Sequence, residues 1–380
     1  MTVGELYDNV FKTTRNGLFC RRLMNIIRGY KVNRLKHLDG LKLIFCLWVV
    51  IYHYWDVLAD RDMSMCFQLL PEKFYSRGNL GVEFFFLLSG FLISYNYKER
   101  LTNGEISILF FLKKRIIAIY PMYFVACTLG VIVNFIGNKP ITVIDLILSY
   151  TMTSIGWFTY RYPYGVAIWF VNVLFLCYIV YAFICKYSKR RSVFLTSLVA
   201  MAMIGVFCLL KDGNIPFMFF VNGRGYLSFF VGCLLYEVQN SLDDGILSLI
   251  TYICVTLLII LFIVNKRLGM FNIFKYKDFS FPIIIYPILL LVVSNVTIIR
   301  KFFENEVMGK ISCLSTSIYF VNYTSMEFLR VITDKINYNL DYSRAYMFLG
   351  VIVMVVMVAI CYKILIEDKL TGYVKGKMSL

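Results

Sequence analysis

The chain has 380 residues, of which 59% are hydrophobic and 16% charged, and its formal net charge is +16. About half of the residues of a soluble domain are apolar and about a quarter are charged, so this composition excludes a soluble protein and predicts a polytopic membrane protein. The basic residues cluster between apolar segments, where they set membrane topology, and we therefore expect no nucleic-acid partner.

Apolar segments follow one another along most of the chain, each close to the roughly 20 residues that cross a bilayer. We predict ten spans, at 41–58, 81–97, 116–136, 166–185, 192–210, 217–237, 246–265, 280–299, 313–332 and 345–366. The segment 141–155 is apolar but carries Asp145 and several hydroxyls, which favours an interfacial or re-entrant helix. The sequence thus predicts an all-α fold with a single membrane domain over 1–380, of which 1–40 form a basic extension.

The basic residues between the spans predict the orientation of the chain. An even number of spans places both termini on one side, and Lys and Arg are frequent before the first span, at 113–115, at 186–191 and at the C-terminal end. Because cytoplasmic segments are rich in Lys and Arg, we expect both termini in the cytoplasm and the chain in the cell membrane. Two loops disagree with this pattern, since 243–244 is acidic and 266–277 is basic.

His53 is the only histidine inside a predicted span, and Lys42 precedes it by eleven residues in LKLIFCLWVVIYHYWDV. An ionisable side chain within a membrane helix is costly and marks a functional site by default. Eleven residues make three helical turns plus roughly 20°, so the two side chains share one helix face and lie about 16 Å apart. A structural histidine is the alternative interpretation.

Two carboxylates are candidates for orienting His53 as a general base. Glu83 in GVEFFFLLSGF is expected near the outer side of the second span, at a similar depth, whereas Asp56 lies three residues after His53 on the same helix. The residues alone do not choose between them, although the setting of Glu83 within its motif favours that residue. A structural ion pair with another span is an equal alternative for Glu83.

A second group of charges is expected at the cytoplasmic side. Lys42 begins the first span, and Lys113, Lys114 and Arg115 begin the third. Four cations at one membrane face suit a phosphate group, to which Arg can donate two parallel hydrogen bonds, whereas a topology signal is the alternative for 113–115. A phosphorylated carrier inside and a base farther out predict chemistry across the membrane.

Several of these segments carry a family resemblance. HLDGLKLIFCLWVVIYH resembles the first helix of the membrane-bound acyltransferase 3 family, whose pattern of a basic residue, ten intervening residues and a histidine is filled by Lys42 and His53. GVEFFFLLSGFLI resembles the second-helix motif, and KKRIIAIYPMY the basic third-helix motif with Tyr120 and Pro121. Weaker matches are IWFVNVLFLCY, RGYLSFFVGCLLYE and ISCLSTSIYFVNY. The resemblance spans most of the chain.

The chain also departs from the family pattern. The family often has Arg in place of Lys42, a second arginine in place of Ala118, a glutamate in place of Leu174 and a histidine in place of Asn322. The set formed by Lys42, His53 and Arg115 is retained.

The resemblance implies an O-acyltransferase that takes an acyl group, which we expect to be acetyl, from cytoplasmic acyl-CoA to a sugar hydroxyl of a surface or exported glycan, or of a lipid-linked sugar. The expected site residues are His53 and Glu83 for catalysis, Lys42, Lys113, Lys114 and Arg115 for the CoA phosphates, and Asn172, Arg224 and Asn322 for the acceptor. His53 would act as a base or carry the acyl group itself. No metal is required, membrane lipids are further partners, and a homodimer is left open.

Simpler roles exist for two of the acceptor residues, since Asn322 could bond between helices and Arg224 could anchor the outer interface. A transporter or flippase of a lipid-linked sugar is the rival function, but it predicts paired repeats or broken helices that the sequence does not show clearly. A non-catalytic scaffold gives no reason to keep Lys42 and His53 on one helix face.

Overall fold

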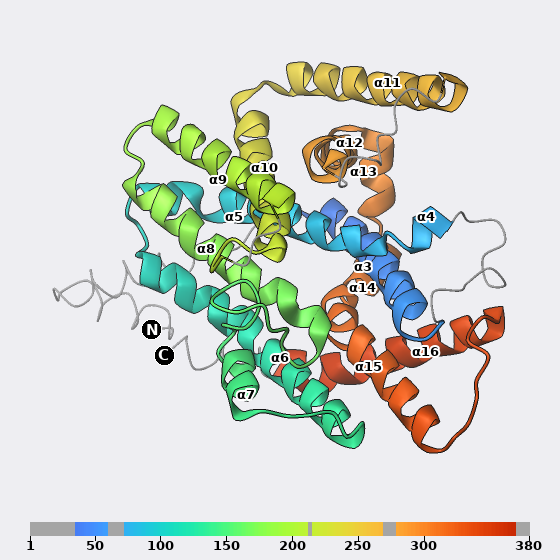
Figure 1. Cartoon of the computed structure of the whole chain (residues 1–380). Helices are drawn as coiled ribbons and strands as arrows, with labels where there is room; N and C mark the ends of the chain where they lie inside the picture. The colour runs from blue at the N-terminus through green and yellow to red at the C-terminus, as the bar shows by residue number, and fades with distance from the viewer. Residues whose placement is uncertain (1–34, 60–71, 212–214, 269–278, 370–380) are drawn as a thin grey trace, which may run out of the picture. The chain divides into compact units, whose positions relative to one another are not determined.

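The computed structural model describes residues 35–59, 72–211, 215–268 and 279–369. Contacts divide the chain into Met1–Leu35 and Lys36–Leu380, and the described helices all belong to the second unit. The described residues form helices joined by loops, with one isolated bridge between Ile155 and Thr159 and no strand (Figure 1). The prediction of an all-α fold is thus confirmed for this part of the chain.

The longer helices are α3 (Lys36–Val57), α5 (Gly81–Thr102), α6 (Ile108–Ile136), α8 (Trp169–Tyr187), α9 (Arg191–Lys211), α10 (Phe220–Ser241), α11 (Asp244–Leu268), α12 (Tyr286–Asn295), α15 (Ser315–Lys335) and α16 (Ala345–Tyr362). Shorter helical elements are α4 (Glu72–Tyr75), η1 (Gly78–Leu80), α7 (Val143–Tyr150), η2 (Val166–Ile168), η3 (Phe281–Ile285), α13 (Thr297–Phe303), α14 (Glu306–Ser312) and η4 (Lys363–Glu367). Every predicted span overlaps at least one of these helices, and the segment predicted as an interfacial or re-entrant helix contains the short helix α7.

Six described helical segments are long and apolar enough to cross a bilayer: Lys36–Val57, Gly78–Thr102, Ile108–Ile136, Val166–Tyr187, Arg191–Lys211 and Ala345–Glu367. The pair Phe281–Asn295 and Thr297–Phe303, bent by 90°, is a seventh candidate. The predicted count of ten is therefore not confirmed. One reason is that α15 carries charged residues along its second half, which lowers its mean hydropathy although it packs against α3, α6 and α16.

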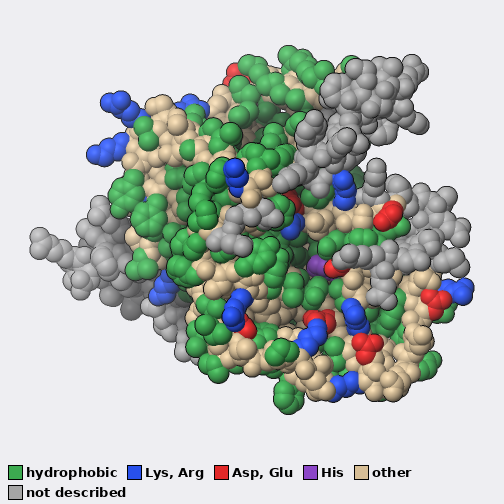
Figure 2. Space-filling model, viewed as in Figure 1, with side chains coloured by type: hydrophobic (Ala, Val, Ile, Leu, Met, Phe, Trp, Pro, Cys, Tyr) green, Lys and Arg blue, Asp and Glu red, His purple; other side chains and the backbone are tan. Residues whose placement is uncertain are grey.

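Among the candidate spans, two lie at the centre of the packing. In the most apolar stretch of the segments containing α5 and α8, 72% of the residues are buried, against 28% for α6 and 22% for the segment containing α16. The outward faces of these last two carry large apolar side chains, as expected for helices in contact with lipid tails. Hydrophobic side chains also cover much of the face seen in Figure 2.

Glycines allow α5 and α10 to approach closely. A Cβ atom at Gly232 would lie 1.9 Å from the carbonyl oxygen of Leu87, and one at Gly90 would lie 2.0 Å from the carbonyl oxygen of Phe229. Small residues on each helix therefore face the backbone of the other, which is a common way to pack helices in a membrane. This contact fixes the start of α10 against the start of α5.

Helices α3 and α15 lie side by side although they are distant in sequence (Figure 1). The thiol of Cys46 donates to the carbonyl oxygen of Ser315 at 3.2 Å, and Arg330 donates to the carbonyl oxygen of Val57 at 3.3 Å. Positions early in α3 therefore meet positions early in α15, and late positions meet late ones. The two helices run in the same direction, as the first and ninth of a set of alternating spans would.

Candidate active site

His53 of α3 is held by a side chain of α15. Its Nδ1 lies 2.5 Å from Oδ1 of Asn322. The amide nitrogen of Asn322 donates to the carbonyl oxygens of Ile318 at 2.9 Å and Tyr319 at 2.8 Å, which leaves the amide oxygen for the imidazole. Because that oxygen only accepts, the proton of the neutral imidazole lies on Nδ1 and the lone pair on Nε2.

The surroundings of His53 suit a general base. Asn322 is 0% exposed, and the imidazole completes the hydrogen bonding of its amide, as most buried polar groups require. His53 is partly exposed, and the Tyr323 ring meets the imidazole edge-on at 5.2 Å between centroids. Nε2 has no hydrogen-bond partner among the described residues. An oriented imidazole with one available nitrogen is the arrangement that proton abstraction requires.

Glu83 does not orient His53, and this corrects the expected pair. Its Oε1 accepts from Nε of Arg224 at 2.6 Å, and its Oε2 accepts from a terminal nitrogen of the same guanidinium at 3.0 Å. Arg224 also donates to the carbonyl oxygen of Asn79 and lies over the Trp169 ring. The physical reason is that α5 and α10 begin side by side, and a buried guanidinium requires a buried carboxylate nearby.

Asp56, the other candidate partner, acts on His53 only through space. Its carboxylate lies on the next turn of α3, close enough for an electrostatic interaction with the imidazole, but the hydrogen bond of the ring goes to Asn322. An amide on another helix therefore does what was expected of a carboxylate.

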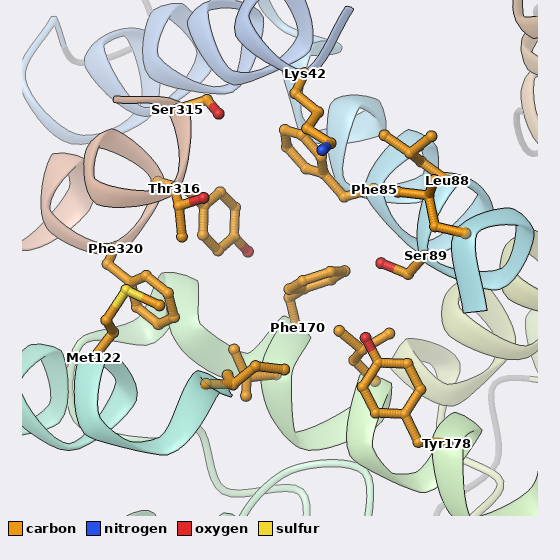
Figure 3. Close-up of a pocket in the computed structure, with 15 residues that line it drawn as sticks. Lys42, Phe85, Leu88, Ser89, Met122, Phe170, Tyr178, Ser315, Thr316 and Phe320 are labelled. Carbon is orange, nitrogen blue, oxygen red and sulfur yellow. The ribbon is translucent and has the colours of Figure 1, made fainter. Parts of the chain in front are cut away.

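Lys42 reaches into a cavity of about 220 Å³ between α3, α5, α6, α8 and α15 (Figure 3). Its ammonium pairs with Asp39 at 2.8 Å, one helical turn earlier. Figure 3 shows the nitrogen of Lys42 and the hydroxyls of Ser89 and Tyr178 directed toward the cavity, whose other lining is mainly aliphatic and aromatic. The cavity can therefore take an uncharged chain beside a single cation.

The basic residues at the start of α6 do not converge on one point. Consecutive residues of a helix project about 100° apart. Arg115 donates to the Tyr97 hydroxyl at 2.7 Å and lies over its ring, Lys114 lies over a phenylalanine ring of the preceding turn, and Lys113 is exposed. Ile119, which lines the Lys42 cavity, follows Arg115 by one helical turn, so Arg115 is the nearest of the three along the chain to the cavity wall. Binding of CoA phosphates by these residues stays a prediction.

The residues predicted to bind an acceptor have other partners in the structure. Asn172 is 0% exposed and donates to Ser154, while its main-chain oxygen accepts from the Trp157 indole, so it ties the loop before α8 to that helix. Arg224 is engaged with Glu83. Binding of an acceptor by Asn172 and Arg224 stays a prediction, and Asn322 bonds between helices, which was the alternative interpretation for that residue.

A polar cleft that was not predicted from the sequence lies at the far end of α15. Its volume is about 580 Å³, and it is lined by charged residues of α3 and α15 together with the end of α6. Tyr323, Glu327, Arg330 and Asp334 follow one another at intervals of four, three and four residues, which places them on one face of α15. Charged residues repeated at this spacing, within and just after the predicted span 313–332, are the signal that would have identified the cleft.

Comparisons with known proteins identify the family of the chain. The family model described as an acyltransferase domain matches residues 35–366. "Protein 2 in picA locus" of Rhizobium radiobacter is 35% identical over 92 residues, which are 24% of this chain and 41% of that protein. No solved structure matches the chain. The matched range contains the Lys42 cavity, the pair of His53 and Asn322, and the polar cleft.

Proposed function

This chain belongs to the acyltransferase 3 family, and from that premise we propose that it is an O-acyltransferase that moves an acyl group, acetyl in the first place, from acyl-CoA to a sugar hydroxyl of a surface or exported glycan. Family membership and the apolar helices make the protein a multi-pass membrane acyltransferase. The same membership favours an enzyme over a transporter or flippase. The donor, the acceptor and the acetyl group belong to the proposal.

The observation that carries this proposal is the order of residues along α3 and α15, which leads from the Lys42 cavity to the pair of His53 and Asn322. Helix α15 lines that cavity with residues between Ser315 and Phe320, and Asn322 follows on the next turn to hold the imidazole. Helix α3 contributes Lys42 to the cavity and His53 farther along in the same direction. A chain that enters beside Lys42 would therefore extend toward the base.

The chemistry assigns one role to each nitrogen of the imidazole. Nε2 takes the proton of the acceptor hydroxyl while the oxygen attacks the carbonyl carbon of the thioester, and the carbon–sulfur bond then breaks. The CoA thiolate leaves and receives the proton from the imidazolium. Asn322 keeps Nδ1 protonated throughout, so only Nε2 exchanges a proton. Such general-base catalysis contributes roughly 10²–10⁴-fold to the rate.

The proposed donor, acyl-CoA, has an apolar part and a phosphate part, and the region of the Lys42 cavity offers an apolar lining and basic side chains. The apolar lining suits the acyl group and the uncharged chain that joins it to the nucleotide. Lys42 and Arg115 lie near the starts of α3 and α6, where they would meet the CoA phosphates. With both termini in the cytoplasm, as the basic residues predict, this end of the site faces the cytoplasmic acyl-CoA pool.

The direct test uses cells of the source organism that lack their own copy of the gene. These cells would receive the wild type, His53→Ala, Lys310→Ala or an empty vector, and the O-acyl content of their surface glycans would be measured by mass spectrometry. Lys310 is 81% exposed on α14 and serves as the control substitution. We expect His53→Ala to match the empty vector while the protein stays in the membrane. Near-wild-type acylation by His53→Ala would refute the mechanism.

A further inference from the structure

The polar cleft has the size and chemistry of a ligand site. Its volume of about 580 Å³ lies within the range of roughly 300–1,000 Å³ that is usual for ligand pockets. Acidic and basic side chains gather over α15 in the lower right of Figure 2. The lining residues are Asp56, Val57, Gly137, Asn138, Lys139, Tyr323, Glu327, Arg330, Val331, Asp334 and Lys335. Such a concentration of charge contrasts with the apolar cavity beside Lys42.

The cleft adjoins His53 on the side opposite the Lys42 cavity. Tyr323 belongs to the cleft wall and its ring contacts the imidazole edge-on at 5.2 Å. Asp56, one turn after His53 on α3, belongs to the same wall. Along α15 the order is cavity, then Asn322, then cleft. The base thus lies between the two spaces, where a transfer reaction would bring its two substrates together.

The charges of the cleft favour an uncharged, hydroxyl-rich ligand. Three carboxylates are matched by three cations in the lining, and Lys139 pairs with Glu327 at 2.5 Å while Arg330 lies 4.0 Å from Asp334. Carboxylates accept and guanidinium groups donate several hydrogen bonds, so together they can bind the neighbouring hydroxyls of a sugar ring. A balanced set of charges gives no net attraction for a polyanion.

We propose that this cleft is the acceptor subsite and that the sugar unit which receives the acyl group there is uncharged. The inference rests on the proposed function, because it assumes that His53 serves an acyl transfer. Glu327 and Arg330 bind hydroxyls of the sugar, and the receiving hydroxyl reaches Nε2 of His53 past the edge of Tyr323, which lines the cleft and contacts the imidazole.

The test separates acceptor binding from donor binding. Cells of the source organism without their own copy would produce the wild type, Glu327→Gln, Arg330→Met, Lys139→Gln or an empty vector. The acylated saccharides would be quantified and sequenced by mass spectrometry, and the affinity of each purified protein for acetyl-CoA would be measured. Glu306→Gln and Arg344→Met are matched controls, because these side chains are exposed at 92% and 52% and lie outside the cleft lining.

We expect the cleft variants to lower the amount of acylated saccharide roughly tenfold or more, as expected for loss of hydrogen bonds to charged groups, with unchanged affinity for acetyl-CoA and the acyl group on a neutral sugar. Wild-type acylation in all cleft variants, a parallel loss of acetyl-CoA affinity, or an acyl group on a uronic or other charged sugar would overturn the inference. Because the Lys139 side chain is 48% exposed, Lys139→Gln should leave the fold intact, and a loss of acylation in this variant would not reflect misfolding. Equal glycan acylation with the wild type and the empty vector would instead refute the proposed function.

Discussion

The side-chain amide of Asn322 fixes the tautomer of His53 from a position 269 residues away in the chain. Two backbone carbonyls of α15 hold the amide nitrogen, so the oxygen has one orientation and the imidazole one protonated nitrogen. The imidazole is thus oriented by a hydrogen bond to an uncharged side chain.

The first prediction follows from this contact. Asn322→Leu removes the acceptor for Nδ1 and should lower kcat roughly tenfold to hundredfold, as expected when a buried donor loses its partner, while the KM for acyl-CoA stays the same. Asn322→Asp keeps an acceptor oxygen and should recover part of the rate. The measurement is steady-state acyl transfer by purified protein over a range of pH. If only KM rises, or if Asn322→Asp does not recover activity, Asn322 is a purely structural residue.

The second prediction concerns the donor end of the site. Lys42→Ala and Arg115→Ala should each weaken acetyl-CoA binding by roughly 1.5–3 kcal/mol, the usual contribution of a charged hydrogen bond. Lys42→Arg keeps the charge and should bind nearly as well. Calorimetry on detergent-purified protein measures the affinities, with Lys310→Ala as the control. Unchanged affinity in both alanine variants would leave these cations with a role in topology only.

The third prediction reassigns Glu83 from catalysis to stability. Glu83→Gln leaves the guanidinium of Arg224 without its buried counter-charge, which should cost roughly 3–5 kcal/mol of stability. The double variant Glu83→Gln/Arg224→Met removes both charges and should regain part of that loss. Thermal unfolding in detergent gives the order of stability of the wild type and the two variants, and Glu306→Gln is the control at an exposed position. A Glu83→Gln protein that melts like the wild type but transfers no acyl group would restore a catalytic role.

The fourth prediction tests the packing of α5 on α10. Gly232→Ala places a methyl group 1.9 Å from a carbonyl oxygen of α5, so the two helices must separate and the protein should be clearly less stable. Gly350→Ala, on α16, meets nothing within 4 Å and should be neutral or slightly stabilising, because alanine is the better helix former. Melting temperatures of the two variants give the comparison. Equal melting temperatures would show that the helices are farther apart than described.

Features that depend on a single helix, or on the order of motifs along the chain, could be predicted from the sequence. Lys42 and His53 occupy one continuous helix, so their shared face follows from helical geometry alone. The helical nature of all ten predicted spans also followed from hydropathy. The number of helices able to span the membrane did not, because α10 and α15 contain polar residues whose partners lie on other helices.

The parts that could not be predicted are contacts between distant helices. Glu83 has the right depth to reach His53, but the glycine contact between α5 and α10 brings Arg224 to it first. For Asn322 the sequence suggested either an acceptor contact or a hydrogen bond between helices, but it did not identify His53 as the partner. The spacing of the charges on α15 indicates one polar face of that helix. That this face encloses a cleft follows only from the positions of α3 and the end of α6.

The distance along the chain between His53 and Asn322 has a consequence for biosynthesis. During translation His53 enters the membrane early, whereas α15 is among the last helices to be made. The nascent protein therefore carries an imidazole without its orienting amide, and without one wall of the Lys42 cavity, for most of its synthesis. The site is therefore complete only after the ribosome has passed α15, so a fragment released earlier lacks the side chain that orients His53.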